Sequence, residues 1–529
     1  MDHGGVFDAV VVGAGPNGSW AAKELAEGGL RVALIDAGPI LRDALFSGQP
    51  DSADLFNPRY HLFRLKALLK GDRHRAFNKF IDRTTSELYL DRARHPYGTA
   101  AGNDFSWSRV RAVGGRGHLW GRVMLRFTED QFHREGCEWP IGVADLAPFY
   151  DEVETLLELG GAPSGTPDVP DGRYVHDREL NELESAFRDA VAERWPHRRA
   201  VVNHVAEYAP APLSPMLVAA RATGNLELRP NTVAASLHHG RNGVIDGVHV
   251  VDTTTGERSV LRASFVVLGA SAFETTRLLL NSSSDAHPDG VGNRHGLVGT
   301  RILEHIMASI LDELPASAVR SDPQYVHNPF RLNEEPHGFY IPSYAQAEEP
   351  EFGEYGYGVQ GTISTDTGLF YVGAFGETRP ADRNRLRIDR SKVDRHGIPV
   401  ADIDFAWSAD DVALFERANR AVVEMTDEFQ RASGIGLKSP MATRIYHKLV
   451  AERPTPGSNH ECGGARMGSD PTTSVVDPNG RVWDVPNVVV CDTSVFPSIP
   501  QQNPTLTSMA LAVRATRALI REAGNALTN

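Results

Sequence analysis

The amino-acid sequence predicts an α/β protein whose nucleotide-binding domain is discontinuous. A strand, a glycine cluster, a helix and a second strand open the chain at residues 7–35. A strand that runs into a helix follows at residues 265–280, and a strand, a loop and a helix occupy residues 487–523. Because β-α units build open sheets covered by helices, we expect these three segments to form one domain of the Rossmann type. The segments between them would then supply a substrate domain.

Local patterns predict the individual elements. Short apolar runs predict strands at 7–12, 31–35 and 487–492 and a series of strands over 225–267, with a hairpin turn in the TTTGE segment at 253–257. Apolar residues at helical spacing predict helices at 17–27, 146–158, 274–280, 410–433 and 505–523. Residues 315–440 alternate short strands with Gly, Pro and Asp turns, which favours an α+β substrate domain with an antiparallel sheet. Residues 45–95 are polar and aromatic, and we expect loops and short helices near a ligand site there.

Composition excludes several classes of function. The 529 residues include 54 Lys and Arg against 68 Asp and Glu, a formal net charge of −14, and so acidic a surface repels nucleic acid and anionic lipid. No apolar run reaches the roughly 20 residues that cross a bilayer, and no basic, cleavable leader precedes the first strand, so we expect no membrane partner and a cytoplasmic location. Cys137, Cys462 and Cys491 are far apart and show no ligand spacing, so neither a disulfide framework nor a metal site is predicted.

The glycine cluster after the first strand predicts a dinucleotide site. Gly13 makes the tight turn, Gly15 lets the backbone approach a pyrophosphate, and Gly18 lets the helix pack closely on the strand. The N-terminus of the helix, beginning at Asn17, directs its partial positive charge at the phosphates. Asp36 ends the second strand, where a carboxylate can accept hydrogen bonds from ribose hydroxyls. These features alone do not separate NAD from FAD.

A resemblance to a known family is carried mainly by the C-terminal block. The block begins at His460 with HECGGARMG and ends in QQNPTLTSMALA. It resembles the glucose–methanol–choline (GMC) oxidoreductases, in particular bacterial members similar to sugar dehydrogenases and pyranose oxidases. Three further segments are similar to landmarks of that family: VGGRGHLW at 113–120 to its flavin-covering loop, WP and DLAPFY within 139–150 to its WPxxxxDLxPYY segment, and FVVLGASAFETTRLLL at 265–280 to its second signature.

The resemblance implies a bound FAD, a CH–OH donor as substrate, and a His–Asn catalytic pair formed by His460 and Asn503. It also implies that Asp492 contacts the flavin side of the dinucleotide and that the backbone at Thr232 and Val233 receives the adenine. Within the covering loop and the last helix, the matched positions that would contact the cofactor are Gly114, Gly115, Trp120, Asn503, Pro504 and Thr505.

Elementary chemistry supports the same roles. Histidine is largely neutral near pH 7 and can take the proton of an alcohol. Asn503 and Pro504 precede an apolar helix, where proline suits the first helical position. The start of that helix would stabilise the negative charge that a flavin gains when it accepts a hydride.

For several other residues the sequence predicts supporting or structural roles rather than a catalytic one. His305 is expected to have a packing or hydrogen-bonding role rather than a catalytic one, and Glu461 is a candidate partner of His460 by adjacency alone. Arg116 and Arg122 could lie near the flavin or the substrate, although a surface ion pair is the ordinary role of arginine. Cys462 and Cys491 are expected to be small buried core residues.

One departure from the family bears on the cofactor. Pyranose oxidases carry a histidine directly before the tryptophan of the covering loop and bond it to the flavin. Here Leu119 precedes Trp120, and His118 lies one residue earlier. In an extended segment a one-residue offset turns a side chain to the other face, so we expect non-covalent FAD.

The sequence therefore predicts FAD-dependent oxidation of an alcohol to a ketone or aldehyde, with His460 taking the proton and flavin N5 the hydride. A sugar, glycoside or sugar-bearing metabolite is the preferred substrate, and the electron acceptor, oxygen or another, is left open. A non-sugar alcohol and a non-redox FAD-containing lyase or isomerase remain as alternatives. The predicted division assigns residues 1–45, 96–135, 216–310 and 455–529 to the FAD domain, and 46–95, 136–215 and 311–454 to the substrate or lid domain.

Overall fold

The computed structural model describes residues 6–43, 66, 88–101, 105–319, 338–350, 355–366, 368–438, 457 and 460–527. Most of the segment 45–95, for which loops and short helices are predicted, lies outside this part of the chain. No helix among the described residues is long and apolar enough to cross a membrane.

The predicted nucleotide-binding sheet is present, and it draws strands from three distant parts of the chain. Its strands follow the order β18-β19-β11-β1-β2-β8, and the neighbours from β19 to β8 are parallel. The bounds are β1 Phe7–Val12, β2 Val32–Ile35, β8 Leu226–Arg229, β11 Arg258–Leu268, β18 Arg481–Val482 and β19 Val485–Val490. Central strands such as β2 are buried at every residue, as expected when both faces of a parallel sheet are covered.

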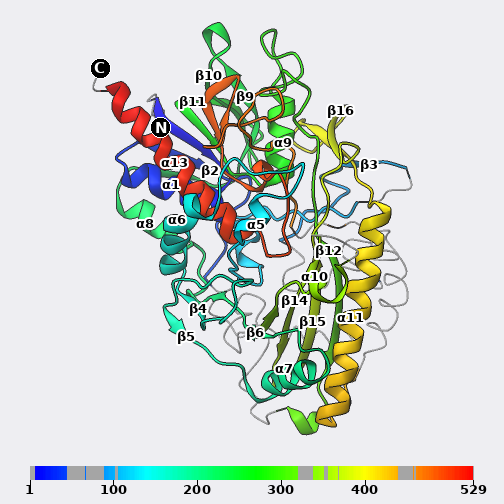
Figure 1. Ribbon diagram of the computed structural model, residues 1–529. Helices are drawn as coiled ribbons and strands as arrows, with labels where there is room; N and C mark the ends of the chain where they lie inside the picture. Colours follow the sequence, from blue (N-terminus) through cyan, green and yellow to red (C-terminus); the bar gives the residue numbers. More distant parts are fainter. Residues whose placement is uncertain are drawn as a thin grey trace.

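Helices cover one face of this sheet and a small antiparallel layer lies at the other. Figure 1 shows α1 and α13 side by side, with α6 and α8 next to them. On the other face α9 packs against β9, and the strands β9, β10 and β11 form an antiparallel ribbon. The bounds are α1 Pro16–Glu27, α6 Val143–Leu156, α8 Pro215–Ala222, α9 Ala272–Asn281, α13 Thr505–Leu527, β9 Thr232–His239 and β10 Ile245–Asp252. The hairpin turn predicted at 253–257 joins β10 to β11, with Gly256 in the left-handed region.

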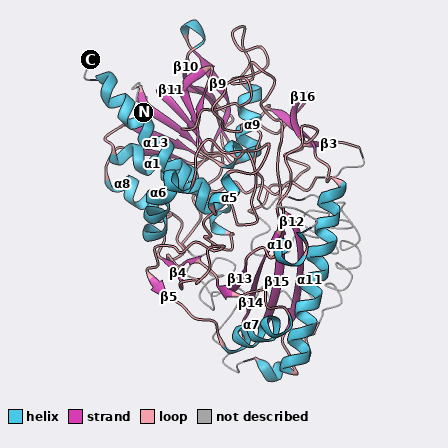
Figure 2. Ribbon diagram, in the orientation of Figure 1, coloured by secondary structure: helices cyan, strands magenta, loops and turns pink. Residues whose placement is uncertain are grey.

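A second, antiparallel sheet forms the core of the other half of the molecule, as predicted. Its order is β12-β15-β14-β13-β6, and Figure 2 shows it beside the long helix α11. The bounds are β6 Val201–Val202, β12 Ile306–Glu313, β13 Phe339–Ile341, β14 Tyr357–Ile363, β15 Leu369–Gly376, α7 Glu182–Arg194 and α11 Ala409–Ser433. Ser408 caps α11 through the amide of Asp411, and Gly434 ends it in the left-handed conformation.

Alternation along these strands gives the sheet two different faces. Val359, Phe370 and Val372 point toward α11 and pack with Leu414 and Phe429. Because successive side chains in a strand point to opposite faces, the intervening residues of β12, β14 and β15 face away from α11. The cavity described below lies on that second face.

The remaining elements are short. Two further sheets have three strands each, in the orders β16-β17-β3 and β5-β4-β7. The bounds are β3 Gly98–Thr99, β4 Leu159–Gly161, β5 His176–Asp177, β7 Val205–Ala206, β16 Arg385–Val393, β17 Pro399–Asp404, η1 Gly115–His118, η2 Arg241–Gly243, η3 Ala316–Ala318, η5 Thr493–Val495, α5 Glu129–Phe132 and α10 Ala345–Glu348. Since β3 pairs with β17 and α6 packs on α13, both across the predicted division, the domain boundaries stay a prediction.

Candidate active site

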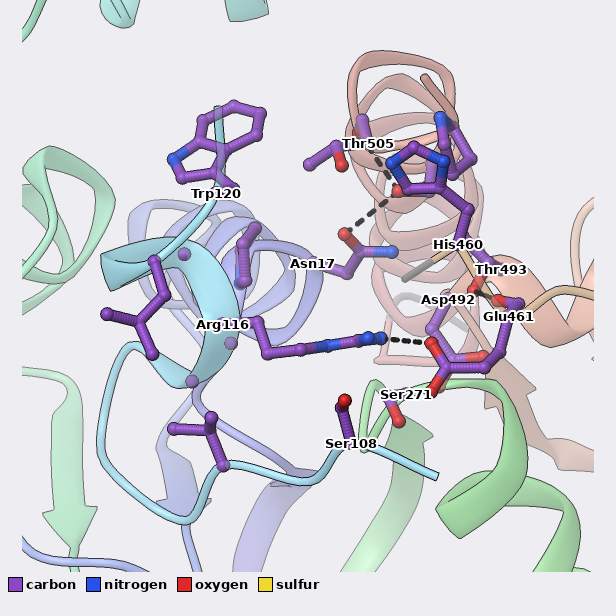
Figure 3. Close-up of a pocket in the computed structure, with 18 of the residues that line it drawn as sticks. Asn17, Ser108, Arg116, Trp120, Ser271, His460, Glu461, Asp492, Thr493 and Thr505 are labelled. Carbon is purple, nitrogen blue, oxygen red and sulfur yellow. Dashed lines mark hydrogen bonds and ion pairs between the residues drawn. The ribbon is translucent and has the colours of Figure 1, made fainter. Parts of the chain in front are cut away.

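One large cavity lies between the two sheets and has a volume of about 520 Å³. One part is lined by the glycine loop after β1, by Asp36 and by Val233, and another part by His460, Asn503 and the cavity-facing residues of β12, β14 and β15. Figure 3 shows Asn17, Trp120, His460 and Thr505 around it. The volume is within the range of about 300–1,000 Å³ that is usual for ligand pockets.

Glycine is needed at three positions of this segment, for a different structural reason at each. Gly13 has φ +95°, and a Cβ there would lie 2.6 Å from the carbonyl oxygen of Gly269. A Cβ at Gly18 would lie 1.8 Å from the carbonyl oxygen of Gly13, so only glycine permits this close approach of α1 and β1. A Cβ at Gly15 would meet no heavy atom within 4 Å, because this residue faces the cavity. Of the three positions, only Gly15 leaves room for a ligand.

Asn17 and Asp36 frame the loop. Asn17 Nδ2 donates to the carbonyl of Cys491 at 3.0 Å, and its Oδ1 accepts from Ser508 Oγ at 3.1 Å, which ties the start of α1 to the end of β19 and to α13. Asp36 accepts from the amides of Ala14 at 2.9 Å and Gly38 at 2.8 Å. Burial raises the pKa of Asp36 to about 6 against these hydrogen bonds.

The covering loop is a turn of 3₁₀-helix rather than the extended segment that the sequence suggested. Gly114 has φ +96°, and a Cβ there would collide with the ring of His118, whose Nε2 donates to the carbonyl of Val113 at 2.7 Å. Successive residues in such a turn point about 120° apart. Leu119 and Trp120 accordingly line the large cavity while His118 does not. Gly115 faces Gly15, with its would-be Cβ 3.4 Å from the Cα of that residue.

Arg116 and Glu461 form an ion pair that ties the covering loop to the segment of His460. The Nη2 to Oε2 distance is 2.5 Å, and Glu461 is only 2% exposed (Figure 3). Adjacency in the sequence suggested Glu461 as a partner of His460, but its carboxylate pairs with Arg116. Arg122 is buried, with its guanidinium over the ring of Tyr208 and donating to that residue's carbonyl at 2.7 Å, rather than a surface ion pair.

Asp492 lines the cavity at the end of β19. Its carboxylate accepts from Ser494, through the amide at 3.0 Å and the hydroxyl at 2.6 Å, and from Thr275 Oγ1 at 2.5 Å. Burial raises the pKa of Asp492. Pro504 and Thr505 also line the cavity, and α13 begins at Thr505, as predicted, with the carbonyl of Pro504 accepting from the amide of Ser508.

His460 and Asn503 lie together, although 43 residues separate them. His460 Nε2 and Asn503 Nδ2 are 3.2 Å apart, and both residues line the cavity. Asn503 Oδ1 accepts a hydrogen bond from Gln360 Nε2 of β14. This contact fixes the orientation of the amide, so the NH₂ group of Asn503 faces His460.

Two buried residues, His305 and Glu304, form hydrogen bonds with His460. His305 Nδ1 lies 2.8 Å from His460 Nδ1, and His305 Nε2 lies 2.6 Å from the carbonyl oxygen of Pro500. Glu304 Oε1 accepts from the backbone amides of both His305 and His460, each at 2.9 Å. The predicted hydrogen-bonding role of His305 is confirmed, and Cys462 next to this site is fully buried, as is Cys491, as predicted.

Sequence reasoning missed Gln360 and Glu304. Gln360 comes from β14, in a region that carries no motif, and Glu304 is one acid among many. A signal for Gln360 was its position between two glycines in YGVQGTI, at a cavity-facing register of a strand. Glu304 lies directly before His305, but only the pairing of Leu303 with Cys462 reveals that its carboxylate reaches both histidine backbones.

The residues of the cavity fit FAD. A turn that excludes side chains at Gly13 and Gly18 leaves an open space at Gly15, in front of the first turn of α1, where a pyrophosphate would meet unpaired amides and the positive helix end. Asp36 and Val233 would hold the ribose and adenine, and Trp120 and Thr505 would flank the flavin. No group of three His, Cys, Asp or Glu side chains in the described ranges could hold a metal ion.

Comparison with known proteins agrees with this arrangement. The family model described as "FAD binding domain" matches residues 8–299, and the model described as "GMC oxidoreductase" matches residues 380–512. The chain is 27% identical to 2-methyl-1,2-propanediol dehydrogenase of Mycolicibacterium austroafricanum, over 96% of this chain and 94% of that one. It is also 27% identical to paromamine 6'-oxidase of Streptomyces fradiae, over 98% and 92%.

The fold is that of solved flavoenzymes. The structure of pyridoxine 4-oxidase from Mesorbium loti superposes with a TM-score of 0.62 at 19% identity, covering 97% of this chain and 98% of that one. The family follows from the two matched models, since the FAD-binding one spans more than half of the sequence and the GMC one matches the C-terminal part. The chain belongs to the GMC oxidoreductases, and it is an FAD-dependent enzyme that oxidises CH–OH groups.

Proposed function

We propose that this enzyme oxidises a hydroxyl of a sugar, glycoside or sugar-bearing metabolite, with His460 as the base and Asn503 as the group that holds the oxygen. The main support for the proposal is that His460 Nε2 and Asn503 Nδ2 lie 3.2 Å apart at the wall of the cavity. A lone pair and an N–H at one point match the two needs of an alcohol hydroxyl, which must donate its proton and accept a hydrogen bond.

The reaction removes a proton from oxygen and a hydride from carbon, so that the C–O single bond becomes a carbonyl. FAD, when bound, supplies the two-electron acceptor for the hydride. His460 takes the hydroxyl proton, and Asn503 Nδ2 donates to the hydroxyl oxygen. Gln360 keeps Asn503 in the orientation that can donate, since it occupies Oδ1. Fixing the alcohol in this way can supply several kcal/mol of the barrier reduction.

The wall of the cavity formed by the antiparallel sheet supports a substrate that carries hydroxyls and has an apolar side. β12, β14 and β15 contribute eight lining residues, none of them charged: Met307, Leu311, Gln360, Gly361, Thr362, Leu369, Tyr371 and Phe375. This wall combines apolar side chains from β12 with the amide of Gln360 and the hydroxyl of Thr362 from β14, a mixture that suits a sugar ring. The named relatives act on paromamine and on a small diol, which supports this class and keeps a non-sugar alcohol as the second candidate.

We propose further that the FAD is held without a covalent bond. His460 is the one histidine among the described lining residues, no described cysteine lines the cavity, and His118 is turned toward the carbonyl of Val113. Acid precipitation should release the yellow colour into the supernatant. Colour that stays with the pellet would refute this attachment. A cytoplasmic location remains a proposal from the sequence alone.

The decisive experiment is anaerobic stopped-flow reduction of the flavin by a panel of sugars, glycosides and simple alcohols. Removing a general base typically slows a reaction about 10²- to 10⁴-fold, so His460→Ala should keep its FAD and reduce it that much more slowly. Asn503→Ala should lose less, because other contacts still dock the substrate. Reduction of His460→Ala at the wild-type rate would place the base elsewhere. Conversion of a substrate without bleaching of the flavin would favour lyase or isomerase chemistry.

A further inference from the structure

His305 does not line the cavity, yet one nitrogen of its ring contacts the proposed base and the other contacts a backbone carbonyl. It precedes β12, is 4% exposed, and lies between the carbonyl of Pro500 and the ring of His460. The two imidazole rings meet edge to face, at 89°. The ring of His305 therefore contacts the ring of His460 without reaching the cavity.

The hydrogen-bonding partners determine where each proton lies. A carbonyl oxygen can only accept, so His305 Nε2 carries the proton that points to Pro500. A neutral imidazole has one N–H, so His305 Nδ1 carries a lone pair, and His460 Nδ1 must donate to it. Neutral His460 then has its remaining lone pair on Nε2, the nitrogen beside Asn503. Burial lowers the pKa of His305 to about 4, which keeps the ring neutral and the chain of donors intact near pH 7.

We propose that His305 is a positioning residue that holds His460 in the tautomer whose Nε2 accepts the substrate proton, an inference that rests on His460 being the base. Once His460 has taken the proton, its Nδ1–H donates to His305 as part of a cation, and hydrogen bonds of charged groups are the stronger ones. The proton stays on His460, because His305 Nε2–H faces only the carbonyl of Pro500 and has no acceptor that could remove its proton. His305 therefore orients and stabilises without touching the substrate.

Glu304 reinforces the arrangement through the backbone. Its side chain accepts from the amides of His305 and His460, so the two chain segments cannot separate without breaking two buried hydrogen bonds. Leu303 and Cys462 pair directly beside it, with amide-to-carbonyl distances of 2.8 and 3.0 Å. The ring-to-ring contact is thus held by a backbone that is fixed on both sides.

Two substitutions of His305 separate the proposed role from packing. In His305→Asn the side-chain oxygen takes the place of Nδ1 and can accept from His460. In His305→Gln the amide reaches toward Pro500 but offers no acceptor where Nδ1 was. Because a hydrogen bond to a charged group is lost in the second variant, its flavin reduction should slow about 10- to 100-fold, with unchanged substrate affinity. His305→Asn should retain most of the wild-type rate.

A second readout does not depend on turnover. Protein labelled with ¹⁵N-histidine, with His460 assigned by its loss in His460→Gln, should show His460 protonated at Nδ1 and not at Nε2. The opposite pattern in the wild type, or equal reduction rates of the Asn and Gln variants, would overturn the proposal. The two proposals fail separately. A fast His460→Ala would refute the base itself, whereas a slow His460→Ala with a fast His305→Gln would refute only the role of His305.

Discussion

Gly15→Val should empty the cofactor site while leaving the fold intact, because its side chain enters the cavity rather than the core. Gly15 has φ −70° and ψ −175°, a conformation open to any residue, and no heavy atom lies within 4 Å of the added Cβ. As Gly15 is the N-cap of α1, valine there costs roughly 0.5–1 kcal/mol. Displacing a pyrophosphate removes two or more hydrogen bonds to a charged group, each roughly 1.5–3 kcal/mol, so FAD affinity should fall about 100-fold or more.

The matched control is Gly18→Val, three residues further on, in the first turn of α1. Its Cβ would lie 1.8 Å from the carbonyl oxygen of Gly13, so this variant should fail to fold rather than merely lose FAD. The ratio of flavin to protein absorbance, calorimetric titration of apoprotein with FAD, and melting of the apoproteins check both expectations. Apo Gly15→Val should melt no more than about 4 °C below the wild type. If it purifies with a full complement of FAD at wild-type affinity, the phosphates do not bind at this loop.

Two further expectations concern charge. Arg116→Ala should destabilise the protein by about 3 kcal/mol, because it leaves the buried Glu461 without its cation, and Glu461→Gln in the same background should restore most of the loss in chemical denaturation. Unchanged stability of Arg116→Ala would show that the ion pair contributes nothing. FAD affinity should fall as pH drops below 6, because ribose hydroxyls donate to ionised Asp36, whose pKa burial raises to about 6. Asp36→Asn should flatten this pH dependence in calorimetric titration, and an equally steep profile in that variant would assign the effect to another group.

The elements of the nucleotide-binding sheet could be predicted because their signals are local. β1, α1 and β2 follow from one run of about thirty residues, and the predicted and observed ends differ by at most one residue. The order of the sheet could not be predicted in the same way. β2 pairs with β8 and β11 pairs with β19, each across roughly two hundred residues or more, and no local period specifies such partners.

The proposed catalytic pair could be predicted from sequence motifs, but the residues that orient the pair could not. His460 and Asn503 lie in segments with a recognisable pattern. Gln360, which orients Asn503, belongs to the antiparallel sheet, where alternation predicts that a residue faces a cavity without saying what it touches. A contact between side chains that lie 143 residues apart depends on how the sheets and helices pack together, and that information is spread over the whole core.

At this site, residues that are adjacent in the sequence do not contact one another through their side chains, and the reason is geometric. Glu461 follows His460 directly, but neighbouring residues in an extended segment point to opposite sides, so Glu461 reaches back to Arg116 of the covering loop. The true neighbours of His460 come from residues 304 and 305, brought in by a two-residue antiparallel bridge between Leu303 and Cys462. That bridge aligns one carboxylate with two backbone amides and one imidazole with another. In the proposed mechanism the tautomer of His460 is fixed by His305, the residue directly before β12, so the substrate-side sheet begins beside the proton that the reaction would move.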